Sequence, residues 1–73
     1  MNKDETPEDK FKRIAEIRTN NVLNSLRVLG NLSNRQVYGY SEKDVNKIFT
    51  AIIKQLKEIK VKFSTQTQAK FKL

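Results

Sequence analysis

The chain carries few of the side chains that active sites use. Its 73 residues include neither cysteine nor histidine, which excludes a thiolate nucleophile, an imidazole base and the usual zinc ligands. Carboxylates, lysines and tyrosines remain, and a pair of facing carboxylates could support hydrolysis. Most of the eight acidic residues, however, stand where helices are expected to begin, and acidic residues stabilise a helix there. We therefore expect a protein that is not an enzyme and that uses no cofactor or metal.

Three polar residues interrupt the apolar face that the first half of the chain predicts. Apolar side chains recur at helical spacing on that face, namely Phe11, Ile14, Ala15, Val22, Leu26 and Leu29. Arg18, Asn21 and Ser25, here called the polar notch, lie at or beside its centre. The favoured interpretation is a polar layer that sets the register and number of associating helices. The alternative is a site for a ligand or a partner's acid, because a buried Arg18 would need a countercharge.

The second candidate site is the connecting segment, residues 30–41. The candidate partner-binding residues in it are Asn34, Arg35, Tyr38 and Tyr40. Aromatic stacking combined with phosphate contact is a common way to bind single-stranded nucleic acid. The favoured interpretation is structural: the tyrosines cover the end of the core, and asparagine and serine favour turns.

Lysines of the second half form the third candidate site. The net charge is +7, and residues 41–73 hold eight lysines against three acidic residues. The candidate partner-binding residues here are Lys54, Lys57 and Lys62, with Lys60, Lys70 and Lys72 beside them. Nucleic acid bound to these lysines would be held without sequence preference, because the group contains no arginine, the residue that makes most bidentate contacts with bases. The binding would weaken as the salt concentration rises. A solvated face is the favoured alternative.

The first of two predicted helices spans residues 7–29. Thr6 can cap it, Pro7 suits its first position, and Asp9 lies where a side chain can reach back to the cap. Gly30 favours the left-handed conformation that ends many helices.

The second predicted helix spans residues 42–63. Ser41 and Asp44 form a Ser-x-x-Asp capping pattern, and Tyr40 and Val45 can form a hydrophobic staple around it. Apolar residues then follow at alternating spacings of four and three, and they form the expected core and dimer interface: Val45, Phe49, Ile52, Leu56, Ile59 and Phe63. Residues 64–73 lose this periodicity, which predicts a flexible basic tail.

The expected fold is all-α, an antiparallel two-helix hairpin over residues 1–63. A chain this short has room for one domain, and with no disulfide or zinc site association is its remaining source of stability. Ile48 and Ile53 widen the apolar face beyond a single seam. We therefore expect two hairpins to form a four-helix bundle as a homodimer, the commonest closed assembly.

The connecting segment also carries a distinctive pattern. The run GNLSNR at residues 30–35, Tyr38 and Tyr40, and the run SEKDVNKIF at 41–49 resemble a recurring class of small bacterial helical modules. The resemblance covers residues 18–63 and implies a prokaryotic helical module whose connecting segment is more than a spacer. It implies no activity and no site residue.

The sequence shows neither an apolar run long enough to span a membrane nor the pattern of a secretory signal. We therefore expect no membrane partner and a cytoplasmic location. We interpret the chain as a non-enzymatic interaction module that dimerises through its apolar faces and offers a basic surface or the connecting segment to another macromolecule. One alternative is a sequence-nonspecific nucleic-acid-binding protein. Another is a small inhibitor or regulator that docks on an acidic protein.

Overall fold

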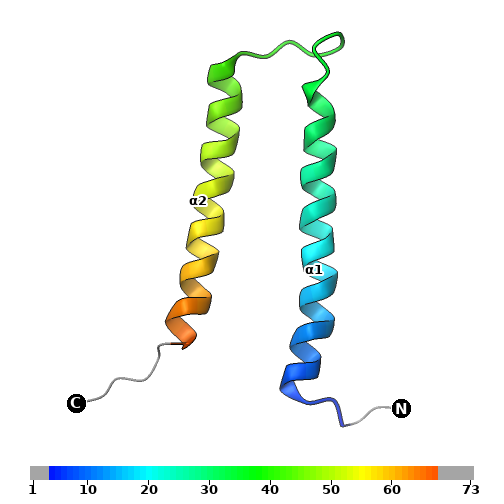
Figure 1. The fold of residues 1–73 in the computed structure, drawn as a ribbon, viewed down its shortest axis with the longest axis vertical. Coiled ribbons are helices and arrows are strands. Elements are labelled where there is room, and N and C mark those ends of the chain that lie inside the picture. Colours follow the sequence, from blue (N-terminus) through cyan, green and yellow to red (C-terminus); the bar gives the residue numbers. More distant parts are fainter. Residues whose placement is uncertain (1–3, 68–73) are drawn as a thin grey trace, which may run out of the picture. The chain divides into compact units, whose positions relative to one another are not determined.

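The computed structural model describes residues 4–67 of the chain, and over this range the protein is all-helical (Figure 1). Helix α1 spans Pro7–Gly30, a short 3₁₀ helix η1 spans Asn31–Ser33, and helix α2 spans Glu42–Thr67. No strand occurs between residues 4 and 67, which confirms the predicted all-α class. The chain divides into two units, Met1–Tyr38 with α1 and η1, and Gly39–Leu73 with α2.

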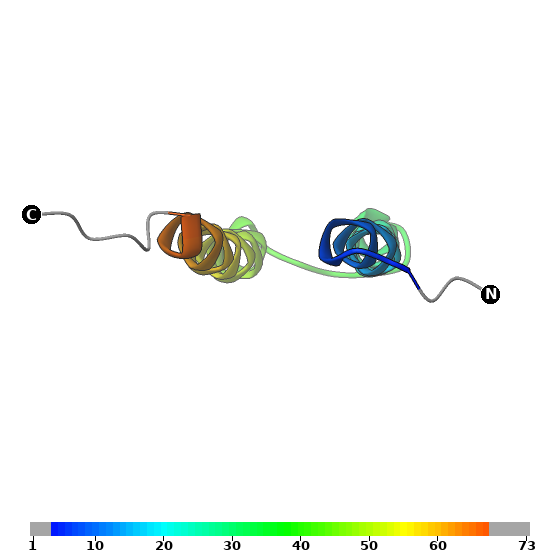
Figure 2. The ribbon, with the colours of Figure 1, turned by 90° about the horizontal axis from the view of Figure 1, so that it is seen from below.

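Helix α1 begins at a complete capping box. The Thr6 hydroxyl accepts a hydrogen bond from the Asp9 backbone N–H at 3.0 Å, and the Asp9 carboxylate accepts one from the Thr6 N–H at 3.4 Å. Pro7 occupies the first helical position, where its missing N–H leaves no hydrogen bond unmade. These bonds satisfy backbone groups that a helix start leaves unpaired. The predicted start is therefore confirmed, and Figure 2 shows α1 from this end, with its first turns nearest the viewer.

The end of α1 differs from the prediction. Gly30 is the last residue of the helix and has right-handed dihedrals, φ −62° and ψ −22°, rather than the predicted left-handed conformation. The Asn31 N–H donates to the carbonyls of Val28 and Leu29, so the chain tightens into η1 instead of reversing. The prediction of a left-handed stop at Gly30 was wrong because a 3₁₀ turn ends the helix equally well.

Asn34 organises the chain after η1. Its side-chain carbonyl accepts a hydrogen bond from the Gln36 N–H at 3.0 Å. Its backbone carbonyl accepts from the N–H groups of Val37 at 3.1 Å and Tyr38 at 2.9 Å. This is the local side-chain to backbone bonding by which asparagine starts a turn. Asn34 thus has the structural role that its residue type predicts.

Helix α2 begins at the second predicted capping box. The Ser41 hydroxyl accepts from the Asp44 N–H at 3.1 Å, and the Asp44 carboxylate accepts from the Ser41 N–H at 3.2 Å. Tyr40 and Val45 are both half-buried, whereas the residues between them are exposed. Their shielding is consistent with the predicted hydrophobic staple.

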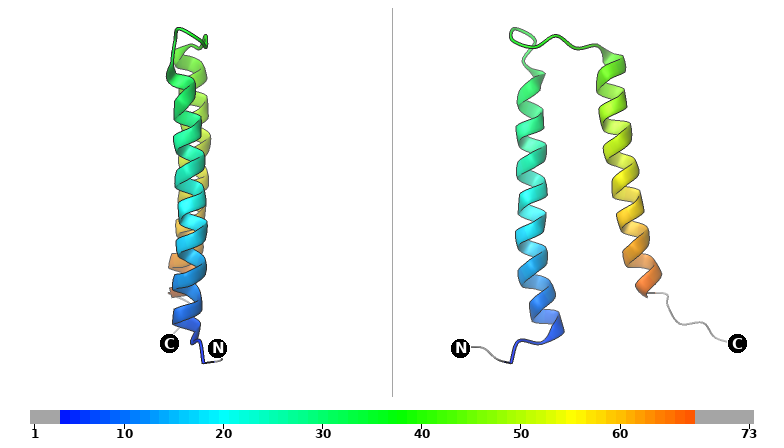
Figure 3. Two further views of the ribbon diagram at one scale, coloured as in Figure 1. Left: turned by 90° about the vertical axis from the view of Figure 1, so that its right-hand side faces the viewer. Right: turned by 180° about the vertical axis from the view of Figure 1, so that it is seen from behind.

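Helix α2 is longer than the sequence pattern predicts. It reaches Thr67, the last described residue and four residues beyond the predicted end at residue 63, and it is continuous over this length (Figure 3). Neither glycine nor proline follows Phe63, so nothing in residues 64–67 stops the helix once its apolar seam has ended. The rest of the predicted basic tail, residues 68–73 with Lys70 and Lys72, lies outside the described residues.

Candidate interaction surfaces

The most extensive surface feature is an apolar seam on α2. The name "α2 seam" refers to the residues that the spacing predicts as the interface: Val45, Phe49, Ile52, Leu56, Ile59 and Phe63. Helix α2 contains all six, so its 3.6-residue repeat brings them onto one face. Phe49 is 51% exposed and Phe63 is 58% exposed. Within its own unit, no side chain between residues 4 and 65 is buried.

Two isoleucines widen this surface. Ile48 flanks the seam on one side and is 39% exposed, and Ile53 flanks it on the other and is 49% exposed. The apolar stripe therefore spans more of the helix circumference than the narrow seam of a two-stranded coiled coil. A contiguous exposed apolar surface of this kind is typical of an interaction site.

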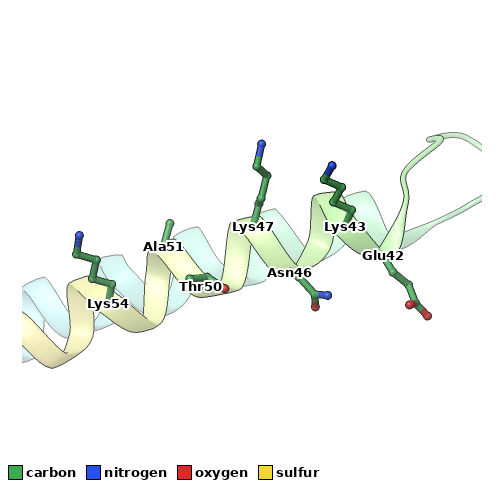
Figure 4. A pocket seen from close by; sticks show the side chains of 7 residues that line it. All are labelled: Glu42, Lys43, Asn46, Lys47, Thr50, Ala51 and Lys54. Atoms are coloured by element: carbon green, nitrogen blue, oxygen red, sulfur yellow. The ribbon is translucent and has the colours of Figure 1, made fainter.

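The opposite face of α2 is basic. Lys43, Lys47 and Lys54 extend to the same side of the helix, with Ala51 between the last two (Figure 4). None of these three lysines forms an ion pair with any residue in the range 4–67. Of the predicted lysines, Lys54 lies on this face. The predicted binding residues did not include Lys43 and Lys47, which their four-residue spacing places on the same side.

Lys57 and Lys62 lie at the borders of the basic face. Helical periodicity rotates each by roughly 60–80° from Lys54, in opposite directions. Lys62 thereby comes next to the α2 seam rather than opposite it. The three predicted lysines of α2 therefore do not form one compact cluster, and the row through Lys43, Lys47 and Lys54 is the better-defined basic surface.

Two hollows on the described surface are shallow and open. The larger lies along the first turns of α2 and is lined by Glu42, Lys43, Asn46, Lys47, Thr50, Ala51 and Lys54 (Figure 4). The smaller is lined by Pro7, Glu8, Phe11 and Lys12 at the start of α1. Both belong to single helices, so neither could enclose a substrate. Among residues 4–67 no group of three or more acidic residues is arranged to hold a metal ion.

The polar notch is exposed to solvent. Arg18, Asn21 and Ser25 each lie at the surface of α1, and helical periodicity places them on one face. Arg18 makes no ion pair with a residue of the described range. Ile14 and Ala15, one turn earlier, are half-buried. The notch therefore presents its charge on the same face as the apolar stripe of α1.

The connecting segment contributes residues to both units. Asn34, Arg35 and Tyr38 belong to the first unit and Tyr40 to the second. Asn34 is engaged in its own turn, and Tyr38 is 45% exposed. All three of these residues of the first unit are exposed.

Within residues 4–67, neither α1 nor α2 contains an apolar stretch long enough to cross a lipid bilayer. No protein-family model, curated protein or solved structure matches the chain.

Proposed function

We propose that this chain is a non-enzymatic helical interaction module that associates with a second copy of itself through the α2 seam. The observation that carries the proposal is the exposure of this seam. Leu56 and Ile59 in its second half are 48% and 38% exposed. Covering such half-exposed side chains is worth roughly 1 kcal/mol each, a gain that α2 by itself cannot obtain.

The residue types along the seam favour an assembly of four helices. The spacing assigns Phe49, Leu56 and Phe63 to the first core position of the heptad and Val45, Ile52 and Ile59 to the fourth. This order departs from a β-branched first position with leucine at the fourth, the arrangement that favours two strands. Two chains with two long helices each supply four strands, so the residue types support a four-helix bundle built from two copies.

Sedimentation of matched variants tests this proposal. We expect the unaltered chain to sediment as a dimer at micromolar concentration. Leu56→Asp places a charge in the seam and should produce a monomer with reduced helicity. Thr50→Asp introduces the same charge on the basic face of α2 and should leave the dimer intact. A folded monomer for the unaltered chain, or equal association of both variants, would contradict the proposal.

The basic face supports a second candidate function, the nonspecific binding of nucleic acid. Its row of Lys43, Lys47 and Lys54 has no carboxylate partner in the described range and covers about 16 Å of helix. Unpaired lysines can neutralise backbone phosphates and release counterions.

Titration of short duplexes and single strands at 50 and 200 mM salt tests this second function. A contact made through phosphates should lose affinity steeply over that range. An absence of binding at 50 mM would exclude nucleic acid as the partner of this face, and it would leave the self-association proposal untouched.

A further inference from the structure

We propose that the α2 helices of two copies pair in antiparallel orientation, about a two-fold axis at the level of residue 54. The inference rests on the proposed self-association and adds its geometry. The interaction surface is the α2 seam, and the partner that fits it is the same seam of a second copy. Two properties of α2 lead to this arrangement, the sizes of the seam residues and the distribution of charge along the helix.

The seam residues match in size when two copies run in opposite directions. With the axis at residue 54, Phe49 lies level with Ile59 of the second copy, because each is five residues from the axis. Every layer then combines a phenylalanine or leucine of one copy with a β-branched residue of the other. The layers are Phe49 with Ile59, Leu56 with Ile52, and Phe63 with Val45. Interfaces pack to native density when large and small residues alternate across facing positions.

A parallel pair would be unevenly filled. It would place Phe49 against Phe49 and Phe63 against Phe63, while Val45 met only Val45. The two phenylalanine layers would push the helices apart and leave space at the valine layer. Parallel pairing would bring Ile48 near Ile53 of the second copy, but these residues flank the seam and do not relieve the mismatch at its centre.

The charge along α2 favours the same orientation. Residues 42–50 hold two acidic and two basic side chains, whereas residues 54–65 hold four lysines and one glutamate, a net charge of +3. Antiparallel pairing places the neutral half of each helix beside the cationic half of the other. Parallel pairing would instead bring Lys60 and Lys62 of one copy level with the same lysines of the other. Physiological salt only partly screens the repulsion between ammonium groups at short separations. Antiparallel helix dipoles add to this preference.

Spin labels on the basic face can measure the orientation directly. The chain has no cysteine, so Lys43→Cys and Lys54→Cys each create a single labelling site away from the seam. Both positions lie on one face of α2 (Figure 4), so their lateral offset from the partner helix is matched. In the antiparallel dimer the two labels at residue 43 are separated by an additional ~33 Å along the axis, since each lies eleven residues from residue 54.

We expect the distance between labels at residue 43 to exceed clearly the distance at residue 54. A mixture of chains labelled at Lys43→Cys and Thr65→Cys should show a short distance, because these sites are level across the axis. Equal distances at residues 43 and 54 in a sedimenting dimer would overturn the antiparallel proposal and leave self-association standing. A monomer by sedimentation, without dipolar coupling at any site, would overturn both proposals together.

Discussion

Arg13 holds the carboxylate of Glu5 with two hydrogen bonds, although eight residues separate them. The Nε donates to Oε2 at 2.9 Å and an Nη donates to Oε1 at 3.2 Å. Glu5 immediately precedes the capping residue Thr6, so this pair joins the entering chain to the second turn of α1. The Arg13 hydrogen bond holds the pKa of the Glu5 carboxyl below its ordinary value, and Glu5 raises the pKa of Arg13.

The first prediction concerns this pair. Arg13→Gln should raise the pKa of the Glu5 carboxyl toward its ordinary value, which an NMR titration of the side-chain carboxyl measures. A pKa lowered by folding stabilises the native state above the unfolded pKa, and this contribution is lost as the pH falls through the folded pKa. The unaltered chain should therefore lose the stabilisation from this ion pair on acidification. The variant has no such pair, so its stability should not show this decrease. Arg27→Gln, which removes an equal charge from the last turn of α1, should leave the Glu5 pKa unchanged.

The second prediction concerns the start of α2. Ser41→Ala removes the hydroxyl that accepts from the Asp44 N–H and should destabilise the helix by about 1 kcal/mol. Circular dichroism during thermal unfolding would show this as a lower midpoint. Ser64→Ala changes the same side chain inside α2 and should leave stability unchanged or slightly raised, because alanine has the higher helix propensity. Equal effects of the two changes would show that the capping box contributes nothing.

The third prediction separates the two interpretations of the polar notch. If Arg18 forms a polar layer within an assembly, Arg18→Leu should make the assembly more stable but less uniform in the number of copies. Sedimentation would then show larger species beside the dimer. Arg27→Leu makes the same change on the opposite face of α1 and should not alter the stoichiometry. An unchanged dimer in both variants would favour the notch as a ligand or partner site.

The fourth prediction concerns the basic face. If nucleic acid binds there, Lys47→Gln should lower the slope of log affinity against log salt by about 0.7–0.9, the contribution of one phosphate contact. The affinity should fall equally for every sequence, because a phosphate contact reads no bases. Lys10→Gln removes an equal charge from α1 and is the matched control. A slope that both variants reduce equally would indicate a general charge effect rather than a contact at this face.

Features decided by neighbouring residues could be predicted from the sequence. The capping boxes at Thr6 and Ser41 each form between residues three apart, so residue type and spacing were sufficient to locate both helix starts. The turn at Asn34 is local in the same way. The α2 seam follows from helical periodicity alone once the helix exists.

Features that depend on competing conformations could not be predicted in this way. Gly30 is compatible with both a left-handed stop and a 3₁₀ turn, and only the structure shows which one ends α1. The continuation of α2 through residues 64–67 was missed because these residues carry no apolar repeat. The Arg13–Glu5 pair was missed as well, because it spans eight residues and involves one residue outside the helix.

The sequence by itself determined the two helices, their starts and the apolar face of α2, because each is set within a few residues along the chain. The three-dimensional structure decided how α1 ends and that α2 continues past its apolar seam. Within its own unit, neither Phe49 on α2 nor Arg18 on α1 is buried. The physical reason is that burial of an apolar seam requires a second surface, and a single helix has none to offer.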